Sequence, residues 1–203
     1  MTVDHPLAPA TLAARPSPVP AALRYRLAAT AEEAGLLDLA YRTVDSPLGP
    51  LLVAATPDGL VRVAFDCEGH DAVLAALAER VSPRVLRAPA RLDDAARQLD
   101  EYFAGDRRGF DLPLDLRLAS PFRRAVVRQL AAIAYGTTAS YATVAAAVGN
   151  PAAVRAVGSA CATNPVPVVL PCHRVVRSDG SIGRYLGGTE LKRALLDLEG
   201  ASA

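Results

Sequence analysis

A chain of 203 residues with 51% hydrophobic and 21% charged residues has the composition of a folded globular protein, and its length suits one large domain or two small ones. Three cysteines at irregular spacing form no CxxC pair, which disfavours a disulfide framework. Cys67 and His70 have no second Cys/His pair to complete a tetrahedral site, which disfavours a structural metal. The apolar runs are shorter than the roughly 18 residues that a membrane helix needs, and the chain has no signal-peptide pattern. We therefore expect a cytoplasmic protein with no membrane contact.

The formal net charge of +1 is unevenly distributed along the chain. Residues 1–116 carry 12 arginines and 17 acidic residues, a balance of −5, whereas residues 117–200 carry 10 arginines plus lysines and 4 acidic residues, a balance of +6. A basic half is typical of a phosphate-binding face, and equally of an ordinary solvated surface. The asymmetry itself favours two domains over one.

The chain opens with a segment rich in alanine and proline, residues 1–38, which predicts a flexible leader, with a short helix expected over 29–37. Residues 39–44, 51–55 and 60–65 then have the composition of short strands. The turns between them carry Pro and Gly at punctuating positions, so we expect an antiparallel meander of three strands.

Helical patterns follow this meander. Apolar residues recur at helical spacing over 71–79 and over 92–103, and each stretch predicts an amphipathic helix. Residues 111–116 alternate polar and apolar, as a short edge strand would. Residues 39–116 are therefore expected to form a small α+β domain.

Residues 117–203 are expected to form a second, mostly helical domain. Apolar residues lie on one face over 121–134, and Gly136 is expected to close that helix. Ser140 has the side chain to N-cap the next helix, which would end at Gly149.

A further helix is expected directly after that point. Asn150 is a favoured N-cap residue and Pro151 suits a first helical position, so the pattern predicts a helix from Pro151 to about Ala162. Two short helices with a Gly-Asn break are typical of a helix-turn-helix, and also of a plain αα-hairpin. Arg155 is the one long cation on a helix of small residues, and it favours nucleic-acid binding.

The tetrapeptide Pro171-Cys172-His173-Arg174 follows a run of apolar residues at 166–170 that looks like buried strand. A buried thiol with a base and a cation beside it can be held as the thiolate, which is the nucleophilic form. The pairing is not a product of abundance, since the chain has 3 histidines. The alternative is a small core cysteine beside a hydrogen-bonded histidine.

The sequence around this tetrapeptide carries several motifs in order. Residues 140–188 read SYATVAAAVGNPAAVRAVGSACATNPVPVVLPCHRVVRSDGSIGRYLGG. The segment resembles the O6-alkylguanine-DNA alkyltransferases, also called methylated-DNA–protein-cysteine methyltransferases, in its SY, GNPxAxRAVG, NPVP, PCHRVV and SDGSxGxY pieces. The likeness extends from Phe122 to Glu199. The N-terminal half matches in layout, where SPLGPLLVAATPDGL resembles the opening hairpin of the family.

The resemblance implies a fold and a function. The expected fold is α+β: a ribonuclease-H-like N-terminal domain with a three-stranded antiparallel sheet plus helices, then a mostly helical C-terminal domain with a winged helix-turn-helix. The expected function is DNA repair by direct, irreversible and stoichiometric transfer of the alkyl group from O6-alkylguanine to Cys172, with O4-alkylthymine as a further candidate substrate. The expected protein is a monomer that binds damaged double-stranded DNA through the minor groove and needs no cofactor or metal.

The resemblance also implies catalytic roles for five residues. Cys172 would attack the alkyl carbon, and His173 would take the thiol proton through a water. Glu199 would orient and charge-stabilise the imidazole, although a carboxylate near a helix end is otherwise simply solvated. Tyr141 would donate a hydrogen bond to the departing guanine, or pack with its hydroxyl in water. Asn164 would hold the turn over the site, or merely form that turn.

Further positions would contact DNA and substrate. Arg155 would enter the DNA stack where the target nucleotide leaves, because chemistry on a paired base requires that base to be extruded. The other DNA-binding positions implied are Tyr141, Ala153 and Ser178. The guanine pocket would be formed by Val175, Tyr185 and Leu186, whereas Arg174 is expected to make a structural ion pair.

The chain departs from the family pattern at a few positions. Arg123 stands where the family often has glutamine, and it adds charge. Arg184 and Leu186 occupy the pocket loop, where smaller residues are frequent, and they could alter the tolerance for bulky alkyl groups. Two other functions fit the same residues: a non-catalytic DNA-binding regulator with a structural Cys172, and a cysteine hydrolase of small substrates.

Overall fold

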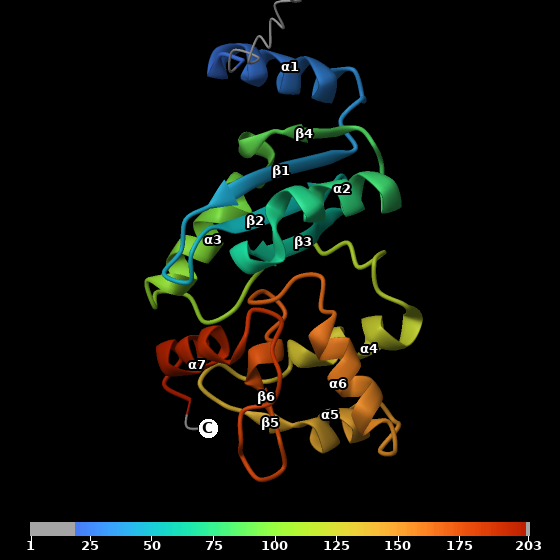
Figure 1. Cartoon of the computed structure of the whole chain (residues 1–203), viewed down its shortest axis with the longest axis vertical. Helices are drawn as coiled ribbons and strands as arrows, with labels where there is room; N and C mark the ends of the chain where they lie inside the picture. Colours follow the sequence, from blue (N-terminus) through green and yellow to red (C-terminus); the bar gives the residue numbers. More distant parts are fainter. Residues whose placement is uncertain (1–18, 202–203) are drawn as a thin grey trace, which may run out of the picture.

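The computed structural model describes residues 19–201, and residues 1–18 of the expected leader therefore lie outside the described residues. Two parts follow one another along the chain: a sheet with its helices, and a group of helices with one short sheet (Figure 1). None of the helices in residues 19–201 has the length and apolar character to cross a membrane.

The first part is built on an antiparallel meander of β1 (Leu39–Val44), β2 (Leu51–Thr56) and β3 (Gly59–Phe65). The expected three-stranded sheet is extended by β4 (Val85–Arg87), which pairs parallel with β1 and gives the order β3-β2-β1-β4. The expectation of three strands was wrong because β4 has 3 residues, too few for any periodic signal.

The expected edge strand over 111–116 is reduced to an isolated bridge between Leu60 and Leu114. Leu60 donates its amide to Pro113 O at 2.8 Å and accepts from the Asp115 amide at 2.9 Å. Pro113 has no amide hydrogen to continue a ladder, which explains why the alternating pattern forms no strand.

Helices α2 (His70–Arg80) and α3 (Asp93–Phe103) agree with the two expected in this part, and a short 3-10 turn, η2 (Pro89–Leu92), leads into α3. The helix expected over 29–37 is instead α1 (Ala21–Glu33), which ends before Gly35 at a φ of 65°. α1 is an ordered element of the expected leader, and it lies at the end of the molecule opposite the C-terminal helices (Figure 1).

The second part contains α4 (Pro121–Leu130), α5 (Tyr141–Ala147), α6 (Val154–Ala162) and α7 (Thr189–Leu198). Strands β5 (Ala139–Ser140) and β6 (Val175–Val176) pair parallel, and the 3-10 turn η3 (Cys172–Arg174) immediately precedes β6. The Ser140 hydroxyl accepts from the Thr143 amide at 3.0 Å, which confirms the predicted N-cap of α5.

Two helix boundaries in this part were predicted wrongly. α4 ends at Leu130 rather than Ala134, because the next three residues donate to carbonyls three positions back in a tightened turn. α6 starts at Val154 rather than Pro151, since Ala153 donates to Asn150 O at 2.9 Å and closes a β-turn with Pro151 at its second position. Asn150 therefore opens a turn and does not cap the helix.

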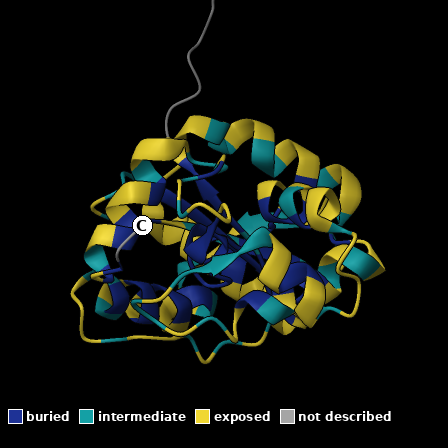
Figure 2. Ribbon diagram, turned by 90° about the horizontal axis from the view of Figure 1, so that it is seen from below, coloured by how far each residue is buried: buried dark blue, intermediate teal, exposed yellow. Residues whose placement is uncertain are grey.

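The two parts are packed together over one hydrophobic cluster that draws buried residues from both. At their junction the edge strand β3 receives the loop that leads to Cys172: Val63 donates its amide to Pro165 O at 2.9 Å. The sheet is buried inside while the helices keep exposed outer faces (Figure 2). This docking places the loop from Asn164 to Pro171 in the interior, where every residue is buried.

Candidate active site

The Cys172 loop is fixed by the side chain of Asn164, which is fully buried. Its amide Nδ2 donates to Leu170 O at 2.8 Å and to Cys172 Sγ at 3.2 Å, and its Oδ1 accepts from the Val166 amide at 3.1 Å. Val168 within the loop has a φ of 72°, a conformation that a β-branched residue adopts rarely and at a cost of about 1–3 kcal/mol. The surrounding bonds hold this strained loop in place.

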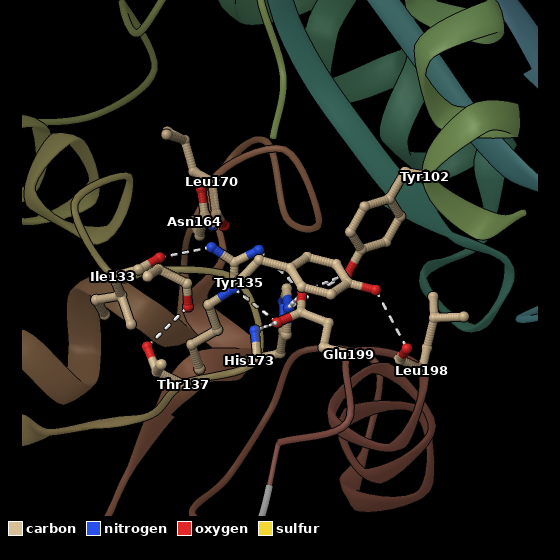
Figure 3. A network of polar contacts seen from close by, with 12 residues as sticks. Tyr102, Ile133, Tyr135, Thr137, Asn164, Leu170, His173, Leu198 and Glu199 are labelled. Atoms are coloured by element: carbon tan, nitrogen blue, oxygen red, sulfur yellow. Dashed lines mark hydrogen bonds and ion pairs between the residues drawn. The ribbon is translucent and has the colours of Figure 1, made fainter. Parts of the chain in front are cut away.

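A buried polar cluster lies beside the loop, centred on Glu199 (Figure 3). His173 Nε2 lies 2.8 Å from Glu199 Oε1, and both side chains are inaccessible to solvent. Arg174 donates from Nε to Glu199 Oε2 and from Nη2 to Oε1, each at 2.9 Å, as a bidentate ion pair. Glu199 lies 26 positions after His173, so tertiary structure alone brings them together.

The carboxylate of Glu199 is held in its charged form. Burial by itself would raise the pKa of Glu199, but hydrogen bonds from His173, Arg174 and Tyr102 outweigh burial and lower the pKa to about 2. The Gly136 amide adds a longer bond to Oε2 at 3.3 Å. Glu199 is therefore an anion at any ordinary pH, and Arg174 makes the structural ion pair expected of it.

Tyr102 belongs to this cluster and was not foreseen from the sequence. It comes from α3 in the first part of the chain, is fully buried, and donates its hydroxyl to Glu199 Oε1 at 2.6 Å (Figure 3). The sequence places Tyr102 on the apolar stripe of α3, which indicates that its ring is buried. A buried tyrosine needs a hydrogen-bond partner for its hydroxyl. The sequence could not say which partner that is.

The thiol of Cys172 is 2% exposed and protonated at rest. Burial raises its pKa to about 11, although the hydrogen bond from Asn164 and the positive charge of Lys192 act in the opposite direction. The nearby cations therefore do not hold the resting thiol as a thiolate, because removal from water outweighs their effect on its pKa. A nucleophilic role for this thiol would therefore require a base that takes its proton.

His173 has a ring nitrogen without a hydrogen-bond partner among the described residues. Its Nε2 faces Glu199, while its buried Nδ1 has no hydrogen-bond partner among the described residues. Burial lowers the pKa of His173 more strongly than the Glu199 hydrogen bond and charge raise it, so the imidazole is neutral at neutral pH. A neutral ring that donates from Nε2 keeps a lone pair on Nδ1.

Lys192 is a second residue that sequence reasoning missed. Its side chain is buried, and its ammonium group donates to the Val175 carbonyl. Burial lowers its pKa, against a raising effect of charge on Cys172 and Cys161. Lysine is rarely fully buried, so its burial near the thiol is unusual. The sequence gives no sign of it, because Lys192 lies on an ordinary amphipathic helix, α7.

Two of the three predicted pocket residues, Val175 and Tyr185, lie beside this centre. Val175 is fully buried. The hydroxyl of Tyr185 is buried without a hydrogen-bond partner among the described residues, and its ring meets His173 edge-on at 6.5 Å between centroids. Leu186 is half-buried and lines a groove between the two parts of the chain.

Tyr141 occupies the first turn of α5 and is half-buried. A Cβ on Gly183 would lie 2.5 Å from its hydroxyl, so this glycine makes room for it. Burial is the main cause that raises the pKa of Tyr141. The hydroxyl is therefore a hydrogen-bond donor in its normal state.

The remaining predicted DNA-binding positions are apart from the buried cluster. Arg155 is exposed in the first turn of α6, Ala153 directly precedes that helix, and Ser178 is exposed in the turn between Arg177 and Ser181. Within residues 19–201 no three His, Cys, Asp or Glu side chains are close enough together to hold a metal ion.

Known proteins are similar to this chain in sequence and in architecture. Residues 39–116 match the family model described as the 6-O-methylguanine DNA methyltransferase ribonuclease-like domain, and residues 121–201 match the DNA binding domain of the same name. The constitutive methylated-DNA–protein-cysteine methyltransferase of Bacillus subtilis is 40% identical over 160 residues, covering 78% of this chain and 94% of that protein. The enzyme of the same name from Methanosarcina barkeri is 36% identical over 159 residues, covering 78% and 96%.

Solved structures agree in fold. Mycobacterium tuberculosis OGT in complex with DNA superposes with a TM-score of 0.68 at 39% identity, covering 81% of this chain and 96% of that chain. The O6-methylguanine-DNA methyltransferase of Pyrococcus kodakaraensis gives a TM-score of 0.58 at 27% identity, covering 80% and 99%. With both family models in order and relatives matched over nearly their whole length, this chain belongs to the 6-O-methylguanine DNA methyltransferase family.

Proposed function

We propose that the chain repairs O6-alkylguanine in double-stranded DNA by transferring the alkyl group irreversibly to Cys172. The observation that carries this proposal is the buried Cys172 loop beside a neutral His173, whose Nε2 is tied to the Glu199 anion. The arrangement offers a nucleophile, a base for its proton and a counter-charge for that base. Relatives named methylated-DNA–protein-cysteine methyltransferase support the same chemistry.

Proton removal is the first step. The thiol proton passes to His173 Nδ1 through a bridging water, and the imidazolium that forms is stabilised by Glu199. The anion needs no rearrangement, because hydrogen bonds from Arg174 and Tyr102 already fix it. The nascent thiolate keeps the hydrogen bond from Asn164 and the charge of Lys192.

Alkyl transfer then follows in line. Cys172 Sγ forms a bond to the alkyl carbon while the bond from that carbon to guanine O6 breaks, and the electron pair leaves with guanine. The Tyr141 hydroxyl donates a hydrogen bond to the departing base, which takes up the proton held by His173. The product is a thioether, which offers water no carbonyl to attack. Each molecule therefore acts once.

Substrate delivery is assigned to α5 and α6 as a helix-turn-helix. Arg155, exposed on α6, would fill the space that the extruded nucleotide leaves, with Ala153, Tyr141 and Ser178 around it. This mode places α6 in the minor groove of the duplex, with one protein molecule per lesion. A family relative crystallised with DNA supports a DNA partner. Arg184 and Leu186 in the pocket loop would determine how large an alkyl group the site accepts. The proposed location of the protein is the cytoplasm.

The test is intact-mass measurement after incubation with a duplex that contains O6-methylguanine. A gain of about 14 Da on the Cys172 peptide is expected, since one CH₂ is added at the nucleophile. Cys172→Ala should lose the mass gain and still bind the duplex. No gain on reduced, folded protein would favour a DNA-binding regulator, and repeated turnover of a small substrate would favour a hydrolase. Either result would overturn the proposal.

The role of Arg155 has its own test. Arg155→Ala should slow repair of duplex DNA far more than reaction with the free base O6-benzylguanine, because the free base needs no extrusion. An equal loss on both substrates would assign Arg155 to the chemistry and not to base flipping.

A further inference from the structure

A groove of about 320 Å³ lies between the two parts of the chain. Its walls come from β3 and α2 on one side and from α4, the end of α6 and the Cys172 loop on the other. Three arginines and no acidic residue line it. The full lining is Arg62, Val73, Ala76, Leu77, Arg80, Leu118, Arg123, Ala162, Thr163, Pro165 and Leu186.

The three arginines differ in what compensates their charge. Arg62 is paired with Glu68 and reaches the carbonyls of Asn164 and Pro165, so it serves the junction between the domains. Arg80 makes one long hydrogen bond, to Leu118 O at 3.4 Å, and no ion pair within residues 19–201. Arg123 has neither a hydrogen bond nor an ion pair among the described side chains.

Two solvent-exposed guanidinium groups, neither with an ion-pair partner among residues 19–201, therefore line one hollow from opposite domains. Nothing in the first turn of α4 offsets Arg123, because that turn holds no acidic residue and the helix dipole is positive there. Guanidinium groups bind phosphate through paired N–H donors, and a shared anion would relieve the repulsion between them. The arrangement fits a phosphate group better than it fits an empty surface.

The position of the groove identifies the source of that phosphate. Ala162 and Thr163, at the C-terminal end of α6, form part of its wall. Arg155 lies seven residues earlier on the same helix, which is about 10 Å along the helix axis.

We infer that the groove holds a backbone phosphate of the damaged DNA, between Arg80 of the N-terminal domain and Arg123 of the C-terminal domain. The inference rests on the proposed function, in which α6 carries the duplex. It gives the N-terminal domain a direct part in DNA binding. A clamped phosphate would also fix the duplex against both domains at once.

The experiment measures the affinity of the full chain for a duplex with O6-methylguanine between 50 and 200 mM salt, by fluorescence anisotropy. Each lost phosphate contact should reduce the slope of log affinity against log salt by about 0.9. The double variant Arg80→Gln with Arg123→Gln removes this one phosphate contact, so the wild-type protein should lose about 3.5-fold more affinity than the double variant over this range. Arg26→Gln on α1, an exposed arginine at the other end of the molecule, should match the wild type.

The rate of reaction with O6-benzylguanine separates this inference from the proposed function. The free base has no phosphate, so the double variant should react with it at the wild-type rate, which also shows that the variant is folded. A double variant with the wild-type salt slope would overturn the inference while alkyl transfer stands. An equal loss of rate on free base and on duplex would place the arginines in the reaction pocket, and would overturn it as well. No reaction of the wild-type protein with either substrate would instead refute the proposed function.

Discussion

Glu199→Gln is the most informative single change, because Glu199 is the anion on which His173, Arg174 and Tyr102 converge. The substitution keeps the size of the side chain and removes its charge. Two losses are expected from it: one in folding stability, and one in the rate of alkyl transfer.

The loss of stability follows from the pKa of Glu199, which is lowered from the usual 4.5 to about 2. That depression is worth about 3 kcal/mol, and the neutral variant also leaves Arg174 buried without a counter-charge. We expect the free energy of unfolding at pH 7 to fall by about 3–5 kcal/mol. Since the folded-state pKa is the lower one, the contribution is present above about pH 4.5 and disappears as the pH falls toward 2.

The loss of rate follows from the charge that appears on His173 during proton transfer. Without the anion beside Nε2, the imidazolium is uncompensated in a buried site, and we expect transfer to slow by about 10²–10⁴-fold. Urea unfolding at pH 7 and at pH 3, with a time course of intact mass on folded protein, measures both effects. Glu190→Gln, an exposed carboxylate in the first turn of α7, is the control.

Two results would refute this reasoning. If the variant transfers methyl groups within about twofold of the wild-type rate, Glu199 does not stabilise the charged base. If the difference in unfolding free energy between the two proteins is as large at pH 3 as at pH 7, the charge of Glu199 is not its source.

Three further predictions address residues around this cluster. Tyr102→Phe removes one hydrogen bond to a charged group and keeps the ring, so urea unfolding should show that the free energy of unfolding falls by about 1.5–3 kcal/mol. The rate of alkyl transfer should fall less than in Glu199→Gln. Unchanged stability would mean that the bond to Glu199 is not formed. Gly183→Ala places a Cβ 2.5 Å from the Tyr141 hydroxyl and should displace it. The rate of alkyl transfer from duplex DNA should therefore fall as far as in Tyr141→Phe, while the melting temperature stays nearly constant. A wild-type rate would show that Gly183 is not needed to make room for the Tyr141 hydroxyl. The Cys172 thiol, with a pKa raised to about 11 from 9, should stabilise the fold below pH 9 and lose that contribution as the pH rises toward 11. The ultraviolet difference spectrum against Cys172→Ala measures this titration, and a midpoint near 9 would show that burial does not control the thiol.

Much of the fold was accessible from local sequence patterns. The meander of β1 to β3 and the helices α2, α3 and α5 follow from residues that are neighbours in the chain, since strand alternation, helical spacing and a serine cap are local properties. The patterns failed where local signals were too short or ambiguous. β4 has 3 residues, and Asn150-Pro151 has the chemistry both of a helix start and of a turn.

The candidate site divides in the same way. The motifs around Cys172 identified the family and predicted the nucleophile and its histidine, because those residues are consecutive and chemically distinctive. Glu199 was placed by resemblance, and neither Tyr102 nor Lys192 was foreseen. Both are polar residues on amphipathic helices, and nothing local indicates that the Tyr102 hydroxyl is buried against Glu199 or that the Lys192 ammonium group is buried against the Val175 carbonyl.

The sequence by itself determined which atoms can react: one thiol beside one imidazole, in a chain whose basic half carries an arginine suited to DNA. The tertiary structure decided the state of those atoms. Burial keeps Cys172 protonated, and a tyrosine from the other domain helps to hold Glu199 as an anion under His173. Ionisation depends on solvent exclusion and on charges that are distant in the chain, and those exist only once the chain is folded.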